Sequence, residues 1–132
     1  MVSENYKMAH QSLSGLCILV VEDEPMIAML LEDMLGDLDC VLVGPAYKTD
    51  AALNIVQSER LDAAILDVNL GGQCTTVVAE ALQAKGVPFV FATGHGAAGV
   101  TGDLSQNLVL TKPFTQTQLE SALRSLCARR SS

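Results

Sequence analysis

Two short apolar runs that end on carboxylates constrain this chain more than any other feature of its sequence. The first run, CILVV at residues 17–21, is followed by three acids at residues 22–24, and the second, at residues 63–66, is followed by Asp67. Because burying a charge costs free energy unless the charge is paired, an acid at the end of a buried strand marks where that strand emerges at a site. We therefore expect three or more acids to gather at one edge of a sheet.

Apolar runs that suit buried strands alternate along the chain with stretches of helical periodicity. The expected strands cover residues 16–21, 41–44, 63–66, 87–92 and 107–110. We expect helices to begin at Pro25, after Thr49 as an N-cap, at Thr75 or Thr76, and at a capping box formed by Thr115 and Gln118. We expect Gly36 to end the first helix and Gly86 the third. This alternation predicts a doubly wound parallel sheet with helices on both faces.

The segment between the fourth and fifth expected strands is rich in glycine. Residues 94–102 alone contain Gly94, Gly96, Gly99 and Gly102. Each glycine inside a helix costs about 1 kcal/mol relative to alanine. We therefore expect the fourth helix to be short, frayed or mobile.

Polar side chains end several of the expected strands, and parallel strands bring such ends to one ligand-binding edge. Mg²⁺ prefers oxygen ligands, so Glu22, Asp23 and Asp67 are candidate metal ligands together with a backbone carbonyl from the loop after Asp67. An ionised Asp67 suits a nucleophile that accepts a phosphoryl group. The hydroxyl of Thr93 and the ammonium group of Lys112 suit contacts to phosphoryl oxygens.

Composition excludes several classes of partner. The net charge of −7, from 15 acids and 8 bases, argues against nucleic acid, whose binding needs clustered Lys and Arg. No apolar run approaches the roughly 18 residues of a membrane span, and the polar first fifteen residues lack the core of a signal peptide. The four cysteines form no CxxC pair, so we expect reduced thiols in a cytoplasmic protein without a zinc site or a membrane partner.

The segments LVVEDEP, LDVNL, FATG and LTKPF follow one another in the order and spacing typical of a known family. From about residue 16 to residue 129 the chain resembles the receiver domain of two-component response regulators. The resemblance implies a flavodoxin-like (βα)5 fold with strand order 2-1-3-4-5 in three α/β/α layers. Residues 1–14 would then be a flexible N-terminal arm and residues 15–130 the receiver domain.

The resemblance also implies roles for individual residues. Asp67 would be the phosphorylation site, Glu22 and Asp23 would be metal acids, and Asn69 would bind Mg²⁺ or Mn²⁺ through its backbone carbonyl. Thr93 would be the switch hydroxyl, and Lys112 would contact the phosphoryl group.

The family's activity is phosphoryl acceptance rather than enzymatic turnover, although a receiver assists its own phosphorylation and dephosphorylation. A sensor histidine kinase or a histidine phosphotransfer protein would supply the phosphoryl group. Since the sequence stops shortly after the last expected helix, at Ser132, we expect a stand-alone receiver. It would signal by phosphorylation-dependent contact with a downstream protein or by phosphorelay.

Three further residues bear on how such a receiver would switch. VPFVFATGHG is similar to the PFxFATGY motif of a receiver subgroup called FAT GUY, with His95 in place of the tyrosine. Three roles are open for this histidine. Its ring takes over the function of the tyrosine, its titration makes the output sensitive to pH near about 6.5, or it is an exposed loop residue without a special role. Val109 stands where receivers usually carry an aromatic residue, and the Lys112–Pro113 bond is a candidate cis peptide that would aim the lysine inward.

Four alternatives remain beside a stand-alone phosphorylated receiver. The first is a receiver-fold interaction module that is never phosphorylated, and the second is a receiver domain excised from a hybrid histidine kinase. An aspartate-nucleophile phosphatase of the haloacid-dehalogenase kind is disfavoured because Asn69 replaces the acid that its DxD motif requires. GHGAAG at residues 94–99 satisfies GxGxxG, but a lone match outside a βαβ unit is weak evidence for a nucleotide-binding module.

Overall fold

A five-stranded parallel sheet forms the centre of the computed structural model, which describes residues 12–70, 73–94 and 109–131. The strands are β1 (Cys17–Val21), β2 (Val41–Ala46), β3 (Ala63–Asp67), β6 (Phe89–Thr93) and β7 (Val109–Thr111). Their order across the sheet is β2-β1-β3-β6-β7. Numbered along the chain this is 2-1-3-4-5, so the predicted flavodoxin-like topology is confirmed.

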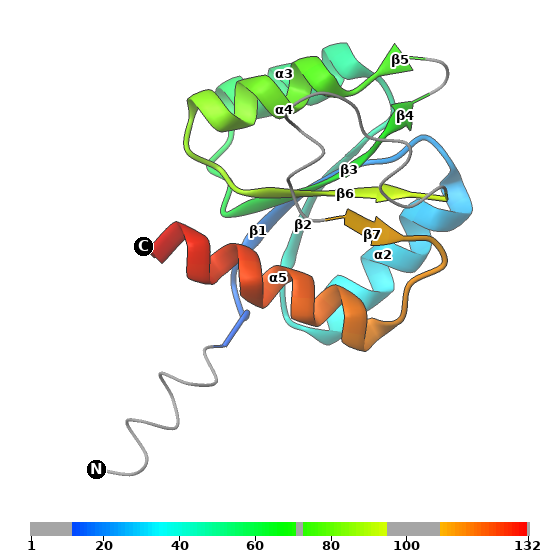
Figure 1. Cartoon of the computed structure of the whole chain (residues 1–132), viewed down its shortest axis with the longest axis vertical. Coiled ribbons are helices and arrows are strands. Elements are labelled where there is room, and N and C mark those ends of the chain that lie inside the picture. The colour runs from blue at the N-terminus through cyan, green and yellow to red at the C-terminus, as the bar shows by residue number, and fades with distance from the viewer. Residues whose placement is uncertain (1–11, 71–72, 95–108, 132) are drawn as a thin grey trace, which may run out of the picture.

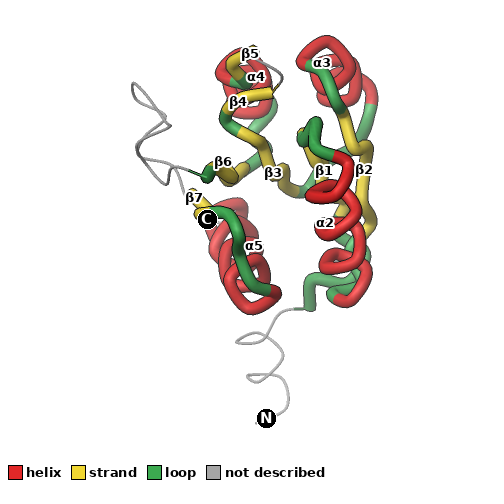
Figure 2. Tube along the Cα trace, turned by 90° about the vertical axis from the view of Figure 1, so that its right-hand side faces the viewer, coloured by secondary structure: helices red, strands yellow, loops and turns green. Residues whose placement is uncertain are grey.

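Helices cover both faces of this sheet. Those in the described ranges are α2 (Pro25–Asp37), α3 (Thr49–Ser58), α4 (Thr76–Ala84) and α5 (Gln116–Ser131). Helices α3 and α4 lie on one face and α2 and α5 on the other, so the molecule has the three predicted layers (Figures 1 and 2). A short antiparallel hairpin, β4 (Asn69–Leu70) with β5 (Gln73–Cys74), lies between β3 and α4.

The central strands are apolar throughout because alternate side chains enter different helical layers. In β1, Leu19 and Val21 pack in the cluster that includes residues of α3 and α4. Ile18 and Val20 pack in the opposite cluster, with residues of α2 and α5. Strands β3 and β6 alternate in the same way. A strand with both faces buried reads as a continuous apolar run, which is why the sequence identified these strands.

Helix ends show where local signals were sufficient and where they were not. Pro25 begins α2 and Gly86 follows α4 with a φ of 72°, both as predicted. The capping box is confirmed, because the Thr115 N–H donates to Gln118 Oε1 at 2.8 Å and the Gln118 N–H donates to Thr115 Oγ1 at 3.1 Å. The prediction for Gly36 was wrong, since α2 continues to Asp37.

The turn after α2 explains that error. Asp39 takes the left-handed conformation, with a φ of 60°, that a glycine would adopt after a helix. Its N–H donates to the carbonyl oxygen of Gly36 at 3.0 Å, and the Cys40 N–H donates to that of Leu35 at 2.9 Å. At the next helix the predicted cap was displaced by one residue, because α3 begins at Thr49 itself and Lys48 occupies the cap position.

Some predictions fall at or beyond the limits of the described residues. The glycine-rich segment expected to hold the fourth helix lies outside them, apart from Gly94, and so do residues 107 and 108 of the expected fifth strand. Leu13, which we placed in the N-terminal arm, is 4% exposed and packs in the cluster with α2 and α5. The boundary of the arm otherwise stays a prediction. Within the described ranges, no helix combines the length and apolar character needed to cross a membrane.

Polar contacts fasten the helical layers and the start of the sheet. The Lys85 ammonium group, after α4, donates to the carbonyl oxygens of Val56 at 2.8 Å and Gln57 at 3.2 Å near the end of α3. The Cys17 N–H, at the start of β1, donates to the buried carboxylate of Asp62 at 2.8 Å. These contacts hold the start of β1 and the ends of α3 and α4 at the amino edge of the sheet, opposite the edge where the acids lie.

Gly44 is the position in β2 where a side chain has no room, and this yields a test of the fold. Its φ is 106°, and an added Cβ would lie 2.8 Å from the backbone nitrogen of Ala46 and 3.0 Å from the carbonyl oxygen of Val20. Gly44→Ala should lower the free energy of unfolding by about 3 kcal/mol or more, because backbone atoms of two strands must shift. Chemical denaturation followed by circular dichroism measures this loss.

Gly86→Ala is the matched control. Gly86 also has a positive φ, 72°, but an added Cβ meets no atom within 4 Å. The control should therefore lose only the roughly 1 kcal/mol of a left-handed alanine. Equal losses in the two variants would show that the close approach at Gly44 is unimportant.

Candidate functional site

Three acids meet at the carboxyl edge of the sheet. Glu22 and Asp23 follow β1, and Asp67 is the last residue of the adjacent strand β3. One carboxylate oxygen from each lies within 4.8 Å of the others. Glu22 is 1% exposed and Asp67 is 8% exposed. The acids thus gather as the two apolar runs led us to expect.

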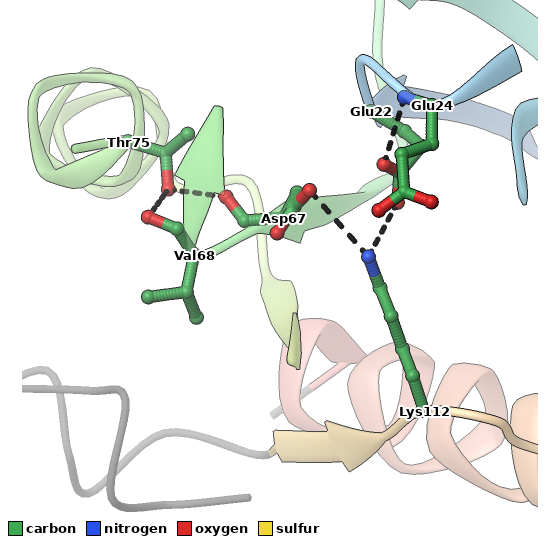
Figure 3. A network of polar contacts seen from close by, with 6 residues as sticks. All are labelled: Glu22, Glu24, Asp67, Val68, Thr75 and Lys112. Atoms are coloured by element: carbon green, nitrogen blue, oxygen red, sulfur yellow. Dashed lines mark hydrogen bonds and ion pairs between the residues drawn. The ribbon is translucent and has the colours of Figure 1, made fainter. Parts of the chain in front are cut away.

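Lys112 joins this acid cluster from the end of β7, the strand at one edge of the sheet. Its Nζ lies 2.8 Å from Glu22 Oε1 and 3.4 Å from Asp67 Oδ2 (Figure 3). The residue directly follows β7, where its backbone N–H donates to the carbonyl oxygen of Thr93 at 2.9 Å. The Lys112–Pro113 bond is cis, as expected.

Thr93 reaches the same edge at the end of β6. It is 4% exposed and pairs with Thr111 of β7. On the other side of β6, Ala92 pairs with Asp67. Thr93 is therefore one residue beyond the level of the acid in the neighbouring strand, so the carboxyl edge collects every strand-end residue that the sequence singled out there.

Burial and charge oppose each other within the cluster. Burial raises the pKa of Glu22, and the negative charge of Asp67 acts in the same direction, while the hydrogen bond from Lys112 reduces the rise. Burial by itself lowers the pKa of Lys112, but its hydrogen bond to Glu22 and the charges of Glu22 and Asp67 outweigh that effect and raise it. Lys112 therefore stays protonated and holds the acids together.

The donor set fits a hard divalent cation. Three ionised carboxylates and one ammonium group leave a formal charge of −2 (three minus one), which a divalent cation would neutralise. Mg²⁺ takes oxygen ligands and retains several waters, so a few carboxylates at an accessible edge suffice. Asn69, two residues after Asp67, begins β4 and pairs with Cys74. Its backbone carbonyl stays a predicted further ligand of the cation.

The residues predicted to act in switching are only partly described. His95 lies outside the described residues. Val109 begins β7, is half-buried and pairs with Phe91. It lines an open groove of about 490 Å³ between β7 and α5, whose other lining residues are Leu110, Thr111, Thr117, Gln118, Ser121, Ala122 and Ser125. A smaller side chain thus stands at the position where an aromatic ring was expected from the family pattern.

One residue near the acceptor was recognised from the sequence only as a helix start. Thr75 is fully buried, and its hydroxyl donates to the carbonyl oxygen of Asp67 at 2.7 Å. The available signal was a threonine at the end of a short loop eight residues after the acid. That signal predicts a cap but does not say which backbone group the hydroxyl binds.

The fold and this edge place the molecule among the flavodoxin-like α/β proteins with an acidic site at the carboxyl ends of their strands. The response regulator receiver domain family matches residues 18–124, and the chain belongs to that family. It is thus a receiver domain of two-component systems, a class of phosphoacceptors rather than classical enzymes.

Solved structures support this membership. The solution structure of SdrG from Sphingomonas melonis Fr1 has a TM-score of 0.73 at 46% identity, and the match covers 88% of this chain and 98% of SdrG. The receiver domain of sensor histidine kinase PA1611 from Pseudomonas aeruginosa PAO1, solved with a magnesium ion in its active site cleft, has a TM-score of 0.73 at 25% identity, covering 87% of this chain and 99% of that one.

Curated relatives are longer proteins. Sensor protein GacS of Pseudomonas syringae pv. syringae is 32% identical over an alignment of 114 residues, and the match covers 77% of this chain and 12% of GacS. Transcriptional regulatory protein TcrA of Mycobacterium tuberculosis is 35% identical over an alignment of 124 residues, and the match covers 89% of this chain and 48% of TcrA. The chain spans less than half the length of these relatives.

The ion pair between Lys112 and Glu22 predicts an unusual response to magnesium. Lys112→Met should destabilise the metal-free protein by about 3–5 kcal/mol, because it leaves a buried carboxylate uncompensated. Added Mg²⁺ should restore much of that loss, since the cation replaces the missing positive charge. Thermal denaturation with and without millimolar Mg²⁺ should therefore show a larger rise in melting temperature for the variant than for the wild type.

Lys48→Met serves as the control for loss of a lysine, because Lys48 is exposed at the start of α3. Its melting temperature should respond to Mg²⁺ as that of the wild type does. A Lys112→Met protein that gains no more from Mg²⁺ than the control would contradict the charge balance described above.

Proposed function

We propose that this receiver domain accepts a phosphoryl group on a carboxylate oxygen of Asp67 from a phosphohistidine donor. A sensor histidine kinase or a histidine phosphotransfer protein would present that donor. The observation that carries the proposal is the Lys112 ammonium group, which lies 2.8 Å from Glu22 and 3.4 Å from Asp67 inside an acid cluster. The Lys112 ammonium group can exchange its contact with one of these carboxylates for a contact with an incoming phosphoryl oxygen, while Asp67 stays ionised.

The chemistry is a single displacement at phosphorus. An Asp67 oxygen forms the new P–O bond while the P–N bond to the donor imidazole breaks, and the electron pair of that bond leaves with the ring nitrogen, which takes up a proton. Lys112 and the Thr93 hydroxyl neutralise and orient phosphoryl oxygens. A divalent cation held by Glu22, Asp23, Asp67 and the Asn69 carbonyl would supply further neutralisation of the transferred group.

We further propose that the phosphorylated receiver acts by protein contact or phosphorelay. Val109 leaves no aromatic ring at its position to rotate together with Thr93, so the signal would pass through other groups of the β6 and β7 strand ends. Membership of the FAT GUY subgroup, in which His95 would take the place of the tyrosine, is part of this proposal. It is supported by the PFVFATGH segment and by the 46% identity to SdrG.

The acceptor is tested by covalent labelling. Incubation with acetyl phosphate and Mg²⁺ should add about 80 Da to the intact mass of the wild-type protein, the mass of one phosphoryl group. Asp67→Asn should abolish the adduct, because an amide is not a nucleophile of this kind. Asp33→Asn, which changes an exposed acid on α2, should leave it intact.

Two results would contradict this assignment. An adduct that survives Asp67→Asn would place the phosphoryl group elsewhere. Wild-type protein that binds Mg²⁺ yet takes up no phosphoryl group from acetyl phosphate or from a panel of phosphorylated histidine kinases would instead identify a receiver-fold interaction module.

A further inference from the structure

Thr75 links the acceptor strand to the helix that follows it. Its Oγ1 lies 2.7 Å from the carbonyl oxygen of Asp67 and 3.4 Å from that of Val68 (Figure 3). A hydroxyl has one proton to donate, and the shorter contact shows that the Asp67 carbonyl receives it. Thr75 is 0% exposed, so no water competes for this bond.

The hydroxyl does this in place of capping its own helix. Thr75 occupies the cap position of α4, where its carbonyl oxygen accepts from the N–H groups of Val78 and Ala79, yet its side chain makes no cap hydrogen bond. Thr115 precedes α5 in the same way and does cap its helix, at 3.1 Å from the Gln118 nitrogen. Since a threonine cap contributes about 1 kcal/mol, α4 forgoes this stabilisation while the hydroxyl binds the tip of β3.

That bond completes the restraint of one peptide plane beside the acceptor. The carbonyl of Asp67 and the N–H of Val68 belong to the same planar unit. The N–H donates to the Ala92 carbonyl oxygen in β6 at 3.2 Å, and the carbonyl accepts from Thr75. Held at both ends by different elements, the plane cannot rotate, and this restricts the backbone of Asp67 and the direction in which its side chain leaves the chain.

We propose that Thr75 is a positioning residue for phosphoryl transfer to Asp67. This rests on the function proposed above, and it adds that the geometry of the nucleophile depends on a hydroxyl outside the cluster of Glu22, Asp23, Asp67 and Lys112. The same bond fixes the start of the loop that carries Asn69, the predicted carbonyl ligand of the cation. Such sites require positioning within about 0.5 Å and 10–20°, and without the Thr75 hydroxyl the peptide plane beside Asp67 would be held only through the Val68 N–H.

Two substitutions at Thr75 separate the hydroxyl from the shape of the side chain. Thr75→Val keeps the volume and removes the donor, whereas Thr75→Ser keeps the donor. Relative to wild type, Thr75→Val should lower the rate constant of phosphorylation by acetyl phosphate at saturating Mg²⁺ by about 10–100-fold, and weaken Mg²⁺ binding measured by calorimetry, as loss of a supporting hydrogen bond does. Thr75→Ser should stay close to wild type in both measurements.

Thr115→Val is the matched control, because it makes the same change at the same position of another helix. It should lower the melting temperature through loss of a cap and leave phosphorylation unchanged. A Thr75→Val protein that is slowed no more than Thr115→Val would overturn the inference, and so would a Thr75→Ser protein as slow as Thr75→Val.

If Thr75→Val does not fold, Thr75→Cys takes its place, since a thiol is a weaker donor of similar size. The serine variant should then be faster than the cysteine variant, and equal rates would overturn the inference. Wild-type protein that takes up no phosphoryl group refutes the proposed function itself. Wild-type protein labelled on Asp67, together with Thr75→Val labelled at the same rate, refutes only the role of Thr75.

Discussion

Compensation of buried charge at the carboxyl edge is the constraint on which the rest of this structure depends. Glu22 is 1% exposed and faces Asp67, so both would be expensive to ionise without Lys112. The three residues come from the ends of β1, β3 and β7, which lie at different positions across the sheet. The charges are therefore balanced only when these strands have their native order and register. The apolar layers supply most of the free energy of folding, while the charged edge penalises wrong arrangements of the strands.

The same edge explains why the receiver is suited to a reversible change of charge. A buried ion pair adds little net stability compared with apolar groups of the same size, so Lys112 contributes more through its position than through energy. Its ammonium group contacts two carboxylates at once. If another oxygen anion takes the place of one of these carboxylates, the ammonium group of Lys112 still has two anionic partners. The lysine is therefore paired before and after the change.

Most of the fold could be predicted from the sequence because its strands are buried on both faces. Continuous apolar runs located β1, β3 and β6, and the acids at the ends of β1 and β3 located the site. The predicted helix ends were wrong where several neighbouring residues could each end the helix. Gly36 was the obvious helix terminator, but Asp39 takes the left-handed position. The β4–β5 hairpin left no signal because its strands have only two residues each.

The site could be predicted as a set of residues but not as a set of contacts. Strand ends identify Glu22, Asp67 and Lys112, since parallel strands bring them to one edge. The partner of the Thr75 hydroxyl depends on how α4 packs against β3, which is a tertiary property. Capping preference recognised this threonine as a helix start, and the same preference describes Thr115, whose hydroxyl has a different partner.

The contact between Lys85 and the end of α3 has a mechanical consequence. The ammonium group bonds two carbonyl oxygens of α3 directly after α4 ends, so these helices are joined at the edge of the sheet remote from the acids. At the acidic edge, α4 is connected to β3 through Thr75. A displacement of the first turn of α4 would therefore be a rotation about a fixed point at Lys85. The resulting movement would be largest next to Asp67 and would vanish at the far end of the helix.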